Sequence, residues 1–168
     1  AYIRMNVKSI GSKTYILQQE QLAKDIGIPE RERKIETSSH YGSRPEHAKW
    51  QGKVFSYKDF VRICKPNTIE GICGANCRHR YFEYIEGVSK PVFEHYNEQE
   101  DKERYIIQQR QRYIEANIRK YKRELAIAEG LGADTSKSKS KIKEWQAIAR
   151  EHTSKYNLIR QYEREKIS

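Results

Sequence analysis

Long apolar runs are absent from this sequence. The longest uninterrupted run of apolar residues is Leu125–Ala128, four residues long, whereas a helix that spans a bilayer needs about 20. A run this short also excludes the apolar segment of a secretory signal peptide. We therefore expect neither a membrane partner nor an export signal within this sequence.

Apolar residues are scarce overall, which limits the size of the core. Hydrophobic residues make up 36% of the 168 residues and charged residues 33%, and the mean hydropathy is −0.99. A single globule with a large interior needs a richer apolar composition. The composition favours a small core joined to an extended helical part that buries one narrow stripe.

Cysteine is also scarce, and its number is odd. The chain has three cysteines, Cys64, Cys73 and Cys77, which cannot all pair with one another. In a sequence that shows no export signal, this usage is typical of a reducing compartment, where thiols are buried or bind a metal.

Basic residues outnumber acidic ones. There are 33 Lys and Arg against 23 Asp and Glu, for a formal net charge of +10, and half of the excess lies before Tyr96. A protein that grips a polyanion with one face concentrates its charge there. The even distribution indicates a general affinity for acidic surroundings, nucleic acid included, and gives no sign of sequence-specific readout.

Residues 1–95 read as a small α+β module of short elements. Apolar residues at helical spacing predict a helix from Ser12 to Gly27, whose inner face comprises Tyr15, Ile16, Leu22, Ala23 and Ile26. Alternating patterns predict three strands of a sheet covered by that helix, at 34–39, 53–57 and 80–85. Ser43 and Glu46 have capping-box spacing and predict a short helix over 44–50. Since the opening residues offer no helix cap, we also expect the chain to continue from a preceding segment.

Residues 96–168 read as a helical arm. Asn97 is placed to cap a helix whose apolar positions step by three, four and seven, as in a heptad seam or coiled coil: Ile107, Ile114, Ile118, Tyr121, Leu125 and Ala128. A second helix over 136–152 has its own seam of Ile142, Trp145, Ala149 and His152. The short glycine-containing turn between them predicts an antiparallel hairpin. Residues 156–166 predict one more short, charged helix.

Chemistry-bearing side chains gather between Ser38 and His79. This stretch holds three of the five histidines, all three cysteines and one of the two tryptophans. Its two loops, one before the predicted short helix and one at Gly71–His79, are expected to close on each other and form a rigid module.

Cys73, Cys77 and His79 are candidate metal ligands, with His40, His47 and Cys64 elsewhere in the stretch. Thiolate and imidazole are the donors that zinc prefers, although paired zinc cysteines usually have two residues between them. The alternative is that the cysteines are buried without metal, since free cysteine is among the most buried residue types. The expectation is no resident cofactor, with zinc as the one candidate.

Hydrolytic chemistry is a second interpretation of the same stretch. If the protein is a nuclease, His40, His47 and His79 are candidates for general acid and base, and Arg44 is a candidate to bind phosphate. The alternative is that the histidines form hydrogen bonds that pin the loop. No carboxylate is placed by spacing as an obvious partner.

Nucleic-acid contact by the arm is a third interpretation. The candidate residues are Arg112, Arg119, Lys139 and Lys143. Cation and aromatic pairs recur every eight residues along the first helix, at Arg104, Arg112 and Lys120, so they spiral around it instead of sharing one face. The alternative is that the tyrosines flank the hairpin seam while the basic side chains are solvated.

Several motifs together resemble the C-terminal part of a bacteriophage minor capsid protein family, itself distantly similar to head morphogenesis proteins of the phage Mu F type. The most specific are SSHYGSRPEHAKWQGKVFS at Ser38–Ser56 and GICGANCRH at Gly71–His79. RMNV at Arg4–Val7, EGVSKP at Glu86–Pro91, QRQRYIEANIRKYKRE and KIKEWQ add to the likeness. Mu F-type relatives have Cys-Arg-Cys where this chain has Cys77-Arg78-His79, a departure that affects any shared metal or redox role.

The resemblance implies a non-enzymatic virion component, made in few copies and associated with the portal side of the head. Its expected partners are portal and capsid proteins and, non-specifically, packaged DNA, after assembly in the host bacterial cytoplasm. The residues expected to form or support a docking module are His40, Arg44, His47, Trp50, Cys73, Cys77, Arg78 and His79. A nuclease or effector domain carried in the phage head is the alternative.

Overall fold

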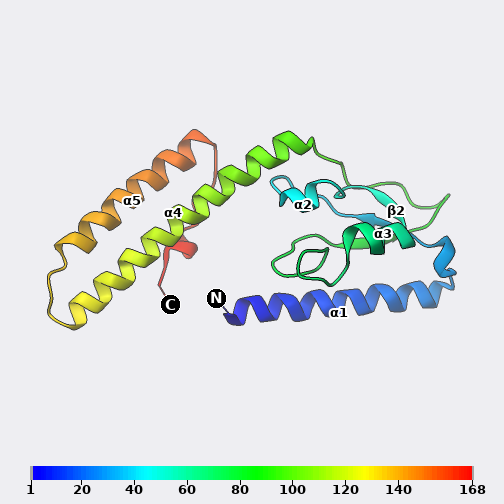
Figure 1. Ribbon diagram of the computed structural model, residues 1–168, viewed down its shortest axis with the longest axis horizontal. Helices are drawn as coiled ribbons and strands as arrows, with labels where there is room; N and C mark the ends of the chain where they lie inside the picture. Colours follow the sequence, from blue (N-terminus) through cyan, green and yellow to red (C-terminus); the bar gives the residue numbers. More distant parts are fainter. Residues whose placement is uncertain (1, 168) are drawn as a thin grey trace. The chain divides into compact units, whose positions relative to one another are not determined.

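The computed structural model describes the backbone of residues 2–167 and the side chains from Ile10 on. Contacts within the chain divide it into two compact units, one up to Tyr105 and one from Ile106 on. The first contains a small sheet with helices and the second a long helical pair (Figure 1). The predicted α+β class, a small sheet followed by an antiparallel helical hairpin, is confirmed.

The sheet of the first unit has three antiparallel strands in the order β2-β1-β3. The central strand is β1 (Lys34–Thr37), flanked by β2 (Val54–Ser56) and β3 (Tyr81–Tyr84). Ile35 faces Phe55 on one neighbour and Glu83 on the other. All three strands fall where alternation predicted them.

The first helix, α1 (Tyr2–Ile26), is longer than the sequence pattern indicated. It begins well before Ser12 because one glycine inside a helix, here Gly11, costs only about 1 kcal/mol. Tyr15 and Ile16 pack on the core as predicted. Leu22 and Ile26, expected on the same face, are 42% and 44% exposed.

Two short helical elements lie between the strands. α2 (Pro45–Ala48) follows β1, and α3 (Tyr57–Cys64) follows β2 directly. Sequence reasoning missed α3, whose N-cap Ser56 accepts a hydrogen bond from the Asp59 amide at 3.2 Å. A 3₁₀ turn of three residues, η1 (Glu30–Glu32), joins α1 to β1.

The core of the first unit is small and mixed. Its buried members come from the sheet, α3 and the loops: Ile35, Trp50, Phe60, Cys64, Ile72, Cys73 and Tyr81. Arg33 is also buried; its guanidinium binds Glu20 of α1 at 3.0 Å and Glu83 of β3, and lies 4.0 Å from the Tyr57 ring centroid. This cation therefore links α1 to the sheet.

The second unit is a helical hairpin of α5 (Ser136–Lys155) and the part of α4 (Glu98–Gly130) from Ile106 on. Ile114, Ile118 and Ala149 form its buried centre, with Trp145 and Ile148 packed beside them. Asn97 caps α4, accepting from the amides of Gln99 and Glu100 at 2.9 and 3.2 Å. The predicted cap is therefore present, and four members of the predicted seam, Ile114, Ile118, Trp145 and Ala149, pack together.

The chain after α5 differs from the prediction. The expected charged helix over 156–166 is a single turn, η2 (Tyr162–Glu165). Buried Glu165 binds the Arg160 guanidinium through both oxygens, at 2.7 and 2.9 Å. This ion pair fixes the conformation of residues 160–165 without a longer helix. No described helix has both the length and the apolar character to cross a bilayer.

Candidate functional site

Two loops of the first unit meet at the predicted site. One runs from β1 into α2, and the other occupies residues 65–80 between α3 and β3. The second loop is tightly folded: a Cβ at Gly71 would lie 1.8 Å from the Lys65 carbonyl oxygen, and one at Gly74 would lie 1.9 Å from that of Thr68. Only glycine fits at these two positions.

Three ligand-type atoms converge where the loops meet. The Nδ1 atoms of His47 and His79 are 3.3 Å apart. Cys77 Sγ lies 3.8 Å from the first and 3.6 Å from the second. His47 and His79 are 1% and 3% exposed, while Cys77 is half-buried. Among the described residues, these three side chains form the group able to hold a metal ion.

The outer nitrogen of each histidine is bound to an oxygen acceptor. His47 Nε2 lies 2.8 Å from the Glu70 carbonyl oxygen, with Arg44 Nη2 at 3.1 Å. His79 Nε2 lies 3.0 Å from Gln51 Oε1. These contacts fix both ring orientations and turn both Nδ1 atoms toward Cys77.

Asp101 supports this arrangement from the first turn of α4. Its carboxylate is fully buried and accepts from the Gly42 amide, from Ser43 Oγ at 2.7 Å and from Gln51 Nε2 at 3.0 Å. Gln51 Oε1 also accepts from the His40 amide at 2.9 Å. The orientation of the Gln51 amide is therefore set from both ends.

The role of Ser43 thus differs from the prediction. The N-cap of α2 is Arg44, with no side-chain capping bond, and the helix ends at Ala48 instead of Trp50. The Ser43 hydroxyl is used by Asp101. A hydrogen bond to a carboxylate is charge-assisted and therefore strong, so this tertiary contact holds Ser43 in place of the predicted capping box.

Aromatic packing encloses the site. The Trp50 ring centroid lies 4.6 Å from that of His47 and 4.9 Å from that of His79. His40 stacks near His79 at 4.8 Å and places Nε2 2.9 Å from the Arg78 carbonyl oxygen. Burial lowers the pKa of His79 to about 2 and also lowers the pKa values of His40 and His47. The three imidazoles are therefore neutral at neutral pH.

The structure gathers a somewhat different metal-ligand set from the one that spacing suggested. Cys77 and His79 converge, and His47 joins them, but Cys73 does not. Cys73 Sγ points to the His79 carbonyl oxygen at 3.6 Å, and burial raises the pKa of its thiol to about 11. Its positive φ of 61° turns the chain there, so the side chain enters the core.

The nuclease candidates also lie together, since Arg44 contacts His47 and His40 packs on His79. Two of the three imidazoles are buried, however, and their nitrogens are occupied by protein groups. Such an arrangement holds loops in place and offers a substrate little access.

The candidate nucleic-acid residues lie on the hairpin. Arg112 and Lys143 are exposed. Arg119 donates to the Arg164 carbonyl, and Lys139 lies 3.9 Å from Glu129. Arg119 and Lys139 therefore contact groups of the same unit.

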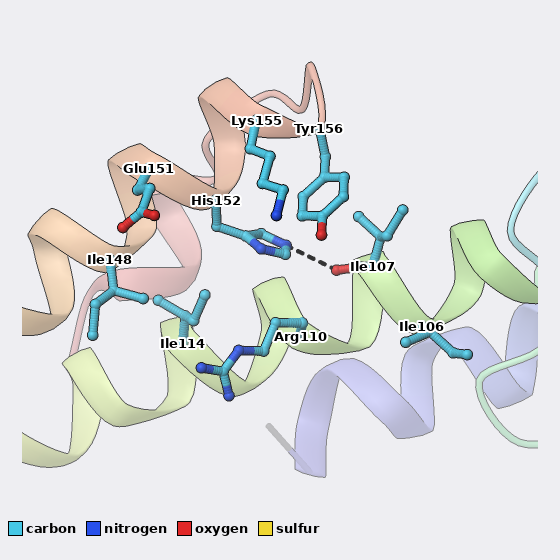
Figure 2. Close-up of a pocket in the computed structure, with 9 residues that line it drawn as sticks. All are labelled: Ile106, Ile107, Arg110, Ile114, Ile148, Glu151, His152, Lys155 and Tyr156. Atoms are coloured by element: carbon cyan, nitrogen blue, oxygen red, sulfur yellow. Dashed lines mark hydrogen bonds between the residues drawn. The ribbon is translucent and has the colours of Figure 1, made fainter.

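A separate hollow of about 420 Å³ lies between α4 and α5. Figure 2 shows the residues that line it, with Ile107 and Ile114 on α4 and Glu151 and Lys155 on α5. His152 Nε2 bonds the Ile107 carbonyl oxygen at 3.0 Å. Apolar and oppositely charged groups alternate around it, so the lining defines no ligand class.

The sequence comparisons identify the family. Residues 1–154 match the family described as phage minor capsid protein 2. A structural protein of Lactococcus phage mv4 is 40% identical over 104 residues, covering 60% of this chain and 85% of that protein. A structural protein of Lactococcus phage LL-H is 40% identical over 142 residues, covering 76% of this chain and 38% of that protein.

This chain therefore belongs to the phage minor capsid protein 2 family. It spans most of the mv4 protein but well under half of the LL-H protein. No solved structure matches it. The predicted resemblance to a phage minor capsid protein family is confirmed.

Proposed function

We propose that the chain is a non-enzymatic virion component that docks on the portal and capsid proteins from the inner side of the head. The observation that carries this proposal is the use made of the site histidines in a phage minor capsid family member. His47 and His79 are buried, and their Nε2 atoms bond Glu70 and Gln51 across the two loops. Assembly in the host cytoplasm and packaging into the virion follow from the same role.

The docking surface is formed by the exposed rim of this module. Of the eight residues expected to dock, Arg78 is exposed and His40 and Arg44 are half-buried, whereas His47, Trp50, Cys73 and His79 are buried. The buried residues set the shape of the module, and the rim meets the partner. Two rim guanidiniums suit an acidic partner surface.

The test is incorporation into phage particles. We expect the double variant Arg44→Ala, Arg78→Ala, placed in the phage genome, to lower the copy number of this protein per purified virion at least fivefold by quantitative mass spectrometry. Lys58→Ala, an exposed basic residue of α3, is the matched control. Wild-type incorporation of the double variant would reject this docking surface, and absence of the wild-type protein from virions would reject the function.

Non-specific DNA contact is part of the proposal. The even positive charge supports it, and the candidates Arg112, Lys139 and Lys143 are exposed on the hairpin. Because phosphate contacts release counterions, the affinity for random-sequence duplex should fall steeply with salt. Arg112→Glu with Lys143→Glu should weaken binding more than Lys24→Glu in α1, as measured by fluorescence anisotropy.

A nuclease carried in the phage head is the second candidate, favoured by the grouping of His40, Arg44, His47 and His79. Cleavage of RNA or DNA by purified protein, lost in His47→Ala while the fold is kept, would establish it. No cleavage above the His47→Ala background would support the structural role.

A further inference from the structure

We propose that His47, Cys77 and His79 bind a zinc ion through Nδ1, Sγ and Nδ1, joining α2 to the loop that precedes β3. These residues also belong to the docking module, but zinc binding can be tested without docking and does not rest on it. It differs from the ligand set suggested by cysteine spacing, because His47 takes the place of Cys73.

The first argument is the spacing of the three atoms. Zinc binds imidazole nitrogen at about 2.0–2.1 Å and thiolate sulfur at about 2.3 Å in tetrahedral geometry. Two nitrogens around one ion are then about 3.3 Å apart, and a nitrogen and a sulfur about 3.6 Å apart. The structure has 3.3 Å between the nitrogens and 3.6 and 3.8 Å from sulfur to nitrogen. All three edges match one ion within a few tenths of an ångström.

The second argument is the position of the imidazole protons. His47 Nε2 lies 2.8 Å from the Glu70 carbonyl oxygen, which can only accept, and 3.1 Å from Arg44 Nη2, which can only donate. The shorter contact favours a proton on His47 Nε2. Gln51 Oε1 is held as an acceptor because Gln51 Nε2 is bound to Asp101 and Oε1 to the His40 amide. His79 Nε2 at 3.0 Å therefore also carries its proton.

Both Nδ1 atoms then present lone pairs to each other at 3.3 Å. Neither can donate, and the Cys77 thiol has one proton, which satisfies at most one of them. The contact between the two nitrogens is repulsive unless a Lewis acid lies between them. A cation bound by both nitrogens and the thiolate removes the repulsion.

The third argument is the support behind the ligands. In zinc sites the far nitrogen of a ligating histidine donates to a carbonyl or carboxylate system that fixes its orientation. His47 has the Glu70 carbonyl, and His79 has Gln51, which is itself held by Asp101. Trp50 packs on both rings and limits their movement.

The donor set selects the metal. Two imidazoles and a thiolate favour zinc over calcium or magnesium, which require oxygen ligands. Three protein ligands leave one tetrahedral position, which water fills in the isolated protein. The ion would tie together two loops that are far apart in sequence.

The experiment uses the full chain after chelation and dialysis. Addition of zinc should give one bound ion per chain by elemental analysis after gel filtration, and should raise the melting temperature. Cobalt(II) should give the thiolate-to-cobalt absorption in the near ultraviolet. His47→Ala and Cys77→Ser should each weaken zinc binding at least 100-fold and abolish the cobalt band.

Cys73→Ala is the discriminating control. It should bind one zinc ion, because Cys73 Sγ points away from the cluster. Circular dichroism checks that each variant keeps its fold. If a variant does not fold, zinc stoichiometry and the cobalt band of the wild-type protein still test the proposal. Less than stoichiometric zinc on folded wild-type protein overturns the proposal. Loss of zinc in Cys73→Ala with retention in His47→Ala also overturns it.

Discussion

Each of the two units of this protein is stabilised internally by a different kind of buried group. The first unit buries a connected set of polar side chains, in which Ser43, Asp101, Gln51 and His79 hydrogen-bond one to the next. Buried His47 lies beside His79 and is bound to the Glu70 carbonyl oxygen. The second unit is centred on Ile114, Ile118 and Ala149. Directional bonds fix atoms closely enough to serve as ligands, whereas an apolar stripe fixes only the register of two helices.

The largest expected loss is at the buried cation of the first unit. Arg33→Met should lower its free energy of unfolding by about 3–5 kcal/mol, because the Glu83 carboxylate, 4% exposed, is left buried without its partner. Urea unfolding monitored by Trp50 fluorescence in a Trp145→Phe background measures this loss. Arg31→Met is the control, since that side chain is 83% exposed. Equal losses in both would contradict the role given to Arg33.

The next effect should appear in the hairpin. Ile118→Ala should cost about 3 kcal/mol, because this fully buried side chain leaves a cavity in the seam. Trp145 fluorescence reports the hairpin, and Ile127→Ala, 62% exposed, is the control. If the Trp50 transition shifted as much as the Trp145 transition, the two units would not be separate in stability.

A smaller change in stability is expected at Asp101, together with a change in metal affinity. Asp101→Asn keeps the shape but replaces one acceptor with a donor, which should cost about 2 kcal/mol. The Gln51 amide loses its fixed orientation, so zinc affinity should fall about tenfold. Competition with a chromogenic chelator measures the affinity, with exposed Lys102→Ala as control. Unchanged affinity in Asp101→Asn would show that Gln51 does not position His79.

The smallest effect is a gain, at Glu115 in the hairpin. Burial raises its pKa despite Arg164 and Arg119, and Oε1 has no hydrogen-bond partner. A carboxyl whose folded pKa is raised favours folding below the unfolded pKa and loses this contribution as pH rises through the folded value. Glu115→Gln should therefore stabilise the hairpin by about 1 kcal/mol at neutral pH and remove this pH dependence. Thermal melts between pH 4 and pH 7, with exposed Glu124→Gln as control, test the sign.

Patterns local in sequence predicted most of the fold. The strands near Ile35 and Tyr81, the Asn97 cap and the seam through Ile114 and Ile118 all follow from periods of two, three and four residues. The helix α3 was missed because eight residues show little more than two turns of pattern, although Ser56 and Asp59 carried a capping signal.

The site was predicted in outline only. Its residue types and the closure of its two loops on each other were expected. The place of His47 instead of Cys73 in the ligand group and the support from Asp101 were not. Asp101 lies in the first turn of α4, where an acidic residue is expected because it interacts favourably with the helix dipole. Nothing local shows that its carboxylate reaches back to Gly42, Ser43 and Gln51.

The sequence alone determined the class of fold, the likeness to phage minor capsid proteins and the stretch in which the chemistry lies, because composition, period and motif are properties of neighbouring residues. The tertiary structure alone decided which donor atoms meet. Cys73 and Cys77 are four positions apart, yet one enters the core and the other faces two histidines. The closure of the loop determines which cysteine faces the histidines. That closure depends on the positive φ at Cys73 and on Gly71 and Gly74, which have no room for a Cβ.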